Sequence, residues 1–183
     1  MNDLGPLPRS WERIDKSGWG PGPWQDEPDK IHWIDEATDL DCLMVRHPDA
    51  GHWCGYVGVT EGHPWFGKDP YECLEGKVDS DGEPERYCDH ALRVDVHGGI
   101  TFTAACAESE DPGRGICHVP LPGRPDHVWW LGFDMHHLYD FAPALEEWRS
   151  KVHLSSRDWE TYRDVAYVQA ECRSLAAQAK AAQ

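Results

Sequence analysis

The sequence predicts an α+β fold: a single domain with a central, mostly antiparallel sheet and a long C-terminal helix packed on it. Segments rich in β-branched and aromatic residues are joined by connections mostly too short for the helical crossovers of a parallel sheet. The last part of the chain instead repeats apolar residues at helical spacing. A length of 183 residues is enough for one domain with a full core.

Residues 1–30 are expected to form an irregular arm ahead of a globular domain over residues 31–183. Trp, Pro and Gly are concentrated in this arm, most densely between Gly18 and Trp24. Proline lacks a main-chain donor and glycine favours turns, so regular structure is not expected there. The tryptophans indicate that the arm lies across the domain rather than free in solvent.

Five segments have the length and composition of strands. A short turn over residues 48–51 joins the first two, which predicts a hairpin. Gly98 and Gly99 separate the third segment from the fourth, and the fifth is apolar enough to lie in the interior of the sheet. The five segments are residues 40–46, 52–60, 92–96, 100–103 and 127–133.

Two helices are expected near the C-terminus. A short one begins near Pro143, within residues 140–150. The longer one is capped by Ser155 or Ser156, carries acidic residues in its first turn and runs to about Ala179. Its packing face, read at helical spacing, consists of Trp159, Tyr162, Val165, Cys172, Leu175 and Ala179.

The chain carries a net charge of −16, from 33 acidic and 17 basic residues. Such a surface repels phosphate, so direct binding to nucleic acid is not expected, whereas attraction to a basic host protein is compatible with it. No run of ~18 consecutive apolar residues occurs, so no membrane helix is expected. The first residues lack the basic and apolar regions of a signal peptide, which makes the cytoplasm the expected compartment.

The seven cysteines are expected to be reduced thiols, in keeping with that compartment. Their odd number argues against a closed disulfide framework, and no C-x-x-C motif occurs. Cys88-Asp89-His90 and Cys117-His118 have residue types that bind metals, although buried free thiols are the simpler interpretation.

One group of residues combines the chemistry of an active site. Asp134, His137 and Asp140 are spaced i, i+3 and i+6, so a helical turn after the strand would point them in one direction. His97, followed by two glycines that leave space near the backbone, completes the group. We expect all four to ligate a divalent metal (Zn²⁺, Mg²⁺ or Mn²⁺), with His97, His137 and Asp140 as catalytic residues.

Without a metal, the same groups fit a general base oriented by a carboxylate. A purely structural role also stays open, in which these residues are hydrogen-bonding partners around a Trp-rich core. A second set of residues is expected to bind the ligand, because aromatic faces stack on a base or sugar and polar groups orient it. This set is His63, Tyr56, Trp129, Trp130 and Thr101.

Three stretches resemble a family of uncharacterised proteins from bacteriophages and mobile elements. They are Gly55-Tyr56-Val57-Gly58-Val59 with His63-Pro64, Val96-His97-Gly98-Gly99-Ile100-Thr101, and Trp129-Trp130-Leu131-Gly132-Phe133-Asp134 with His137 and Asp140. The resemblance covers about residues 31–145. The family pattern has one His after the Gly-Phe-Asp, and His137 matches that position. His136 is therefore a departure from the family pattern. The resemblance implies action inside a bacterial cytoplasm and brings no activity with it.

Two functions therefore compete. The first is a metal-dependent hydrolase of a nucleotide-like small molecule, with a pocket lined by His and Asp side chains. The alternative is a non-enzymatic inhibitor of a bacterial defence system, which sequesters a nucleotide signal or binds a basic partner through its acidic surface.

Overall fold

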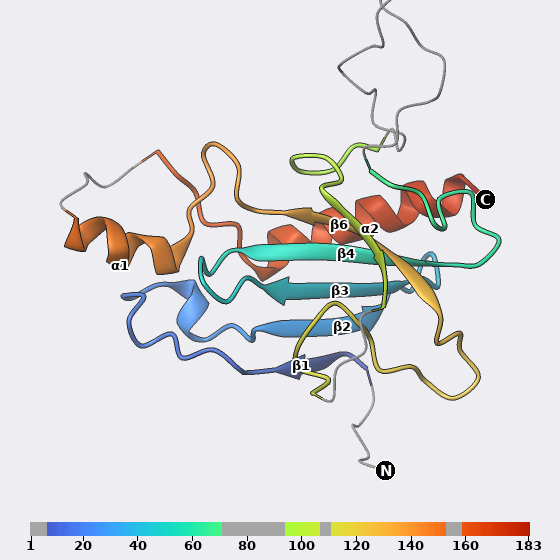
Figure 1. Ribbon diagram of the computed structural model, residues 1–183, viewed down its shortest axis with the longest axis horizontal. Helices are drawn as coiled ribbons and strands as arrows, with labels where there is room; N and C mark the ends of the chain where they lie inside the picture. The colour runs from blue at the N-terminus through green and yellow to red at the C-terminus, as the bar shows by residue number, and fades with distance from the viewer. Residues whose placement is uncertain (1–6, 71–93, 107–110, 153–158) are drawn as a thin grey trace, which may run out of the picture.

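The computed structural model describes residues 7–70, 94–106, 111–152 and 159–183. Six strands form one sheet in the order β1-β2-β3-β4-β6-β5, and every neighbouring pair is antiparallel (Figure 1). This confirms the predicted α+β class. The strands are β1 (Arg9–Trp11), β2 (Lys30–Ile34), β3 (Asp41–Arg46), β4 (Trp53–Thr60), β5 (Phe102–Ala105) and β6 (Val128–Asp134).

One face of the sheet packs against the C-terminal helix α2 (Val165–Ala181), which lies behind the strands in Figure 1. Alternate side chains of the strands supply this core, since successive residues of a strand point to opposite faces. The helix contributes its own buried row. The fully buried members from both layers include Cys42, Met44, Val57, Leu131, Val168, Cys172, Leu175 and Ala179.

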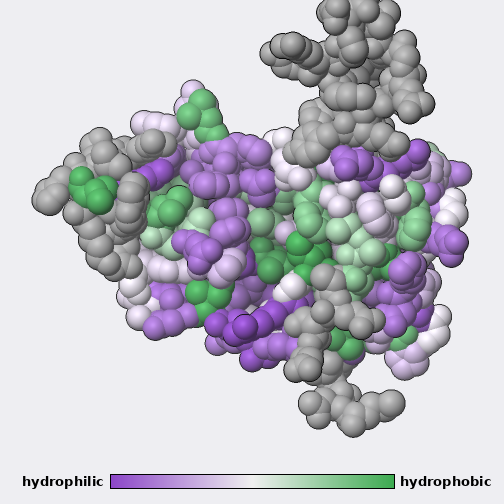
Figure 2. Space-filling model, in the orientation of Figure 1, coloured by the Kyte–Doolittle hydropathy of each residue, from purple (hydrophilic) through white to green (hydrophobic). Residues whose placement is uncertain are grey.

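The opposite face carries a smaller core formed by Leu43, Tyr56, Val128 and Trp130. Ile116, from the segment between β5 and β6, packs against it. Apolar surface near the middle of the face seen in Figure 2 is flanked by hydrophilic residues. Part of this second face is therefore formed by a loop rather than by regular structure.

The predicted hairpin is present as β3 and β4, and the apolar segment forms β6, flanked on both sides as expected. The short helix α1 (Pro143–Lys151) begins at the predicted residue. The prediction of a strand over residues 92–96 is wrong for the described residues 94–96, which are not in a strand. Their place is fixed instead by α2, because Asp95 exchanges two hydrogen bonds with the side chain of Gln178.

The start of the last helix was also predicted wrongly. It begins at Val165, and Asp164 is its cap, with the carboxylate accepting a hydrogen bond from the Tyr167 N–H. Ser155 and Ser156 lie outside the described residues. Trp159 and Tyr162, expected on the helical face, precede the helix.

The arm is more regular than predicted, because β1 pairs with β2 and residues Pro23–Gln25 form a 3-10 turn, η1. Its anchor is the buried Arg46 of β3. This guanidinium forms ion pairs with Glu27 at 2.8 Å and Asp29 at 3.3 Å and lies over the ring of Trp53. Arg46, Glu27 and Asp29 are thus paired with one another rather than left as single charges in a low-dielectric interior.

No helix within the described residues combines the length and the apolar character that a membrane span requires.

Candidate functional site

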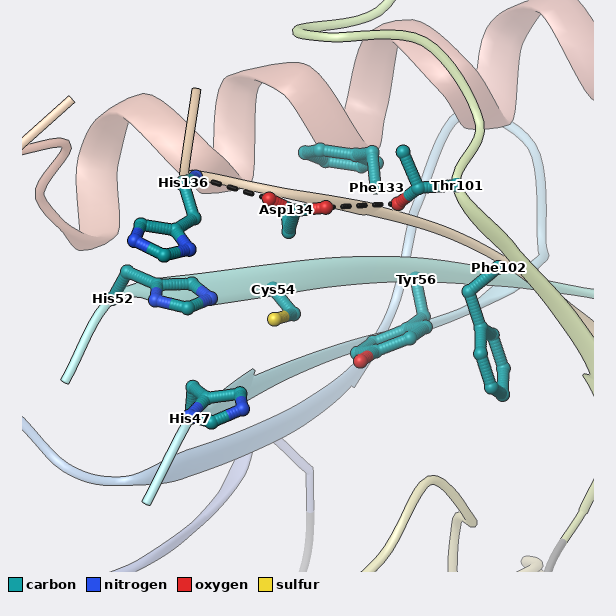
Figure 3. A pocket seen from close by; sticks show the side chains of 9 residues that line it. All are labelled: His47, His52, Cys54, Tyr56, Thr101, Phe102, Phe133, Asp134 and His136. Carbon is teal, nitrogen blue, oxygen red and sulfur yellow. Dashed lines mark hydrogen bonds between the residues drawn. The ribbon is translucent and has the colours of Figure 1, made fainter. Parts of the chain in front are cut away.

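An open cavity of about 270 Å³ lies where the β3–β4 turn meets the end of β6 (Figure 3). It is found on the face opposite α2, beside the second core. Figure 3 shows imidazoles on one side of it and the rings of Tyr56 and Phe102 on the other. We call it the histidine pocket. It is lined by His47, His52, Cys54, Tyr56, Thr101, Phe102, Phe133, Asp134 and His136.

Three imidazoles form a stack along one wall. The β3–β4 hairpin places His47 and His52 on either side of its turn, where the His47 N–H donates to the His52 carbonyl. Their ring centroids are 4.9 Å apart, and His136, from the end of β6, stacks on His52 at 4.6 Å. The two interplanar angles are 20° and 11°, so the rings are nearly parallel.

His52, in the middle of the stack, is neutral at neutral pH. Burial, together with the neighbouring rings of His136 and His47, lowers its pKa to about 4. Its Nδ1 atom is buried and has no hydrogen-bond partner among the described residues. A buried imidazole nitrogen without a partner is costly, and a ligand able to hydrogen-bond to it would remove that cost.

The thiol and the phenol in the pocket stay protonated. Burial raises the pKa of Cys54 to about 12, with the charge of Asp134 adding to the effect. Burial likewise raises the pKa of Tyr56 far above its usual value. Because the thiolate is the reactive form of cysteine, Cys54 is not a nucleophile here.

Asp134 supplies the carboxylate of the pocket. Its Oδ2 accepts from the Thr101 hydroxyl at 2.9 Å, and its Oδ1 accepts from the His136 N–H at 3.0 Å (Figure 3). One hydrogen bond to each oxygen fixes the carboxylate and leaves each oxygen able to accept a second donor. Asp134 is therefore an oriented acceptor for a ligand or for the proton of a water molecule.

The glycine at position 132 makes room for the aromatic wall. A Cβ atom there would lie 2.5 Å from Cδ1 of Tyr56. The ring of Tyr56 consequently lies across the backbone of β6 and meets Phe102 edge to face, with centroids 5.6 Å apart. This leaves an aromatic surface next to the carboxylate, suited to a flat ligand.

The structure also brings together the four residues expected to share a site. Nε2 of His97 lies 2.7 Å from Oδ2 of Asp140. The rings of His97 and His137 are 5.5 Å apart, and Nε2 of His137 lies 3.6 Å from Oδ1 of Asp134. Asp134 therefore joins this cluster to the histidine pocket. The residues meet through a turn after β6, however, and not through the helical turn that was expected.

His97 and Asp140 belong to a longer chain of hydrogen bonds. The Asp140 carboxylate also accepts from Arg163 at 2.9 Å. Burial by itself would raise the pKa of Asp140, but the hydrogen bonds from Arg163 and His97 outweigh it and hold this pKa below its usual value. When Nε2 of His97 donates to the ionised Asp140, Nδ1 of the same ring can accept from the Tyr167 hydroxyl, 3.0 Å away.

Gly98 fits this cluster closely. It adopts a φ of +68°, and a Cβ atom would lie 1.8 Å from Nε2 of His137. Glycine does leave space here, as expected, and the side chain of His137 occupies that space. Nε2 of His137 is itself buried and without a hydrogen-bond partner among the described residues.

The predicted metal ligands are not arranged around a common point. Oδ2 of Asp140 accepts from His97 and from the His137 N–H, and Oδ1 accepts from Arg163. A cation would have to replace these donors, including a guanidinium. Within the described residues, one group of His, Cys, Asp or Glu has three ligand atoms all within 4.8 Å of one another, and it is Cys106, Cys117 and His118.

Three of the expected ligand-binding residues lie elsewhere. His63 is at the opposite end of β4 from the pocket, where its Nε2 hydrogen-bonds to the Ala179 carbonyl at 2.9 Å. Its Nδ1 accepts from the Trp65 N–H, so its role here is structural. Trp130 is fully buried in the second core, and the Trp129 indole donates to the Lys68 carbonyl. Tyr56 and Thr101 do line the pocket.

The expectation of reduced cysteines is wrong for one pair. Cys106 and Cys117 form a disulfide, and Cys42, Cys54 and Cys172 are free. The spacing of 11 residues between the bonded pair matches no motif that would have revealed it. Cys88-Asp89-His90 lies outside the described residues.

Sequence reasoning missed His47, His52, Cys54 and His136 as pocket residues. A signal for two of them was present, since His47 and His52 flank the turn of the predicted hairpin and must be neighbours.

No family model, curated protein or solved structure matches this chain. The resemblance to bacteriophage proteins therefore stays a prediction from the sequence motifs.

Proposed function

We propose that the protein binds a small, planar, nucleoside-like molecule in the histidine pocket and hydrolyses it by general acid–base chemistry. The observation that carries this proposal is the oriented carboxylate of Asp134 beside an imidazole stack in which Nδ1 of His52 has no partner among the described residues. A concave site with a few convergent polar groups and an aromatic wall is the usual form of a small-molecule pocket.

The size and charge of the pocket narrow the class of ligand. Ligand pockets usually enclose about 300 to 1,000 Å³, so a cavity of about 270 Å³ suits a single small molecule. Among the residues that the structure describes, no Lys or Arg lines it, and the chain has a net charge of −16. A phosphate group would find no cationic partner in the pocket, which favours the nucleoside or base portion of a nucleotide-like ligand.

The reaction uses groups that lie next to one another. Water forms a bond to the ligand carbon that carries the leaving group, and the bond between this carbon and the leaving group breaks. Asp134 accepts the proton of the attacking water, and His136 donates a proton to the leaving group. His52 stays neutral, because its pKa is about 4, and offers its Nδ1 atom for a hydrogen bond with the planar ligand. The His97–Asp140 pair holds the turn that follows Asp134, and this turn places His137 beside Asp134.

The test is a panel of nucleosides and nucleobases, screened by ligand-detected NMR and then incubated and separated by liquid chromatography. We expect one class to bind and be consumed. Asp134→Asn should lower affinity or turnover at least tenfold, whereas Asp95→Asn, a change at an exposed carboxylate outside the pocket, should leave both unchanged. A ligand that binds but returns unchanged would make the protein a sequestering binder, and no binding by any member would overturn the proposal.

Chelation distinguishes a metal-dependent hydrolysis from the metal-free hydrolysis by Asp134 and His136. Turnover that survives EDTA supports hydrolysis by Asp134 and His136. Turnover that is lost in EDTA and restored by Zn²⁺, Mg²⁺ or Mn²⁺ would show that the reaction depends on a metal ion. The ligands of that ion would then be His97, Asp134, His137 and Asp140.

A second role is favoured by the net charge of −16. An acidic surface of this kind attracts a basic protein, and in the bacterial cytoplasm that the motif resemblance implies, such a partner would belong to a defence system. Capture of a basic protein at low salt and its release at ~0.5 M salt would support this role, because salt screens exposed charges. Binding unchanged by salt would count against it.

A further inference from the structure

Cys106, Cys117 and His118 form a compact group on the face of the sheet opposite α2. Cys106 follows the end of β5, and Cys117 lies in the segment between β5 and β6, with the two Cα atoms 4.7 Å apart. Nδ1 of His118 lies 3.5 Å from Sγ of Cys106. Two sulfurs and one imidazole nitrogen within 4.8 Å of one another are the ligand set of many zinc sites.

The imidazole of His118 is oriented as a metal ligand would be. Its Nε2 lies 3.3 Å from the Pro125 carbonyl, to which it can donate only if that nitrogen carries the proton. Nδ1 of the neutral ring is then unprotonated and directs its lone pair toward the sulfur of Cys106. Metal-binding histidines in proteins usually donate their second N–H to a carbonyl or carboxylate in this way.

The surrounding chain is also held by contacts that do not involve the S–S bond. The buried ammonium of Lys30 donates to the carbonyls of Pro112, Gly115 and Cys117 at 2.8, 3.1 and 2.7 Å. The Trp130 indole donates to Sγ of Cys106 at 3.3 Å. Because these contacts fix both ends of the bridge independently, opening it would leave the two sulfurs close together.

A neighbouring buried histidine, His32, has one ring nitrogen without a hydrogen-bond partner among the described residues. His32 is fully buried, and its ring packs edge to face on His118 with centroids 5.6 Å apart. Its Nε2 hydrogen-bonds to Asp41 at 2.8 Å, whereas its Nδ1 has no partner among the described residues. The group therefore has an unsatisfied nitrogen beside it that a bound cation or its water ligand could use.

The group is also accessible. A cavity of about 290 Å³ opens against Cys117 and His118, with Asp126 in its wall. It shares no lining residue with the histidine pocket. A small reductant and a metal ion thus have a route to Cys117 and His118 that does not pass through the proposed ligand site.

We propose that Cys106, Cys117 and His118 form a redox-controlled metal site that takes Zn²⁺ or a similar thiophilic cation when the disulfide is reduced. A dithiol reductant transfers two electrons and two protons, so that the S–S bond breaks, two thiols form and the reductant becomes a disulfide. Binding of the cation then displaces both thiol protons and forms two metal–sulfur bonds. Water or the Asp126 carboxylate, which lies in the wall of the cavity, would supply the fourth ligand.

The test uses the full chain, purified without a metal-affinity tag and carrying Cys73→Ser and Cys88→Ser, since those cysteines lie outside the described residues. The protein is reduced with a phosphine, freed of reductant and titrated with Co²⁺ without oxygen. We expect one tightly bound Co²⁺ per chain, with a near-ultraviolet thiolate-to-cobalt absorption that Zn²⁺ displaces. Calorimetry in buffers of different ionisation enthalpy should show about two protons released.

Variants and the oxidised protein decide the outcome. The oxidised protein needs no substitution and should bind no Co²⁺ at this site. Cys117→Ser should abolish the thiolate band, and His118→Asn should weaken binding at least tenfold, while Cys42→Ser, a change at a free cysteine in the core against α2, should leave both unchanged. Equal binding by the oxidised and reduced forms, or a band that persists in Cys117→Ser, would overturn the proposal.

Discussion

Nε2 of His97 lies 2.7 Å from Oδ2 of Asp140, although 43 residues separate them in the chain. The side chain of Asp140 is fully buried, and three segments donate to it: the turn at His97, the turn at His137 and the approach to α2 at Arg163. Asp140 also forms a parallel bridge with Thr161. This carboxylate therefore ties the loops beside the histidine pocket to one another.

Asp140→Asn should lower the free energy of unfolding by about 2 kcal/mol, since hydrogen bonds to a charged group contribute about 1.5–3 kcal/mol. The amide keeps one acceptor oxygen but loses the charge that faces Arg163 and His97. Urea unfolding at pH 7 measures the change.

Asp39→Asn is the matched control. Asp39 also pairs with an arginine, Arg124, at 2.8 Å, but its side chain is 79% exposed. Exposed pairs contribute about 1 kcal/mol at most, so this variant should stay close to the parent. Equal losses in the two variants would show that Asp140 does not organise the loops.

The sequence predicted the elements whose patterns are local. The β3–β4 hairpin, β6 and α1 follow from short-range alternation, turn residues and a proline at a helix start. β2 was missed because Lys30 and His32 break the apolar pattern, yet both are buried. Lys30 donates to three carbonyls and His32 pairs with Asp41, partners that come from other segments.

The site was predictable in part for the same reason. His97, Asp134, His137 and Asp140 were singled out by residue type, and the fold does bring them together. The sequence could not show which hydrogen bonds these residues form. Arg163, which saturates Asp140, comes from a segment whose helix start was predicted wrongly, and the disulfide between Cys106 and Cys117 has no spacing signature.

Glu27 should make stability depend on pH in the acid range. Burial by itself would raise the pKa of Glu27, but hydrogen bonds from Tyr162, Arg46 and the Val165 N–H outweigh it and lower this pKa below the usual 4.5. A carboxyl with a lowered folded pKa contributes stability that is complete above pH 4.5 and is lost as the pH falls through the folded value.

Urea midpoints measured from pH 6 to pH 3 test this. The parent should lose stability below about pH 4.5, and Glu27→Gln, which cannot titrate, should start less stable at pH 6 and show a shallower decline. A variant with the same slope as the parent would mean that Glu27 is not the group responsible.

A third prediction is that His52 stays neutral at pH values well below the ordinary pKa of histidine. Its folded pKa of about 4 lies below the ordinary 6.5, because burial and the two stacked rings disfavour its charged form. The unfolded chain therefore takes up the proton first, and stability falls as the pH drops from 6.5 toward 4. The imidazole Hε1 resonance, assigned with His52→Gln, should barely move above pH 5. A titration midpoint near 6.5 would disprove the buried, neutral stack.

Gly132→Ala tests the aromatic wall of the pocket. The new Cβ atom would lie 2.5 Å from Cδ1 of Tyr56, so the ring must move, and such overpacking typically costs about 1–3 kcal/mol. Gly58→Ala is the comparison within the neighbouring strand, since its Cβ atom would lie 3.1 Å or more from Trp130 and should cost less.

Adding Tyr56→Leu to Gly132→Ala removes the ring that clashes. The double variant should therefore be less destabilised than the sum of the two single variants, with a coupling of about 0.5 kcal/mol or more in urea unfolding. Ligand binding by Gly132→Ala should weaken in parallel, because the displaced ring narrows the space beside Asp134. Strict additivity, or a Gly132→Ala variant as stable as Gly58→Ala, would place Tyr56 away from the backbone of β6.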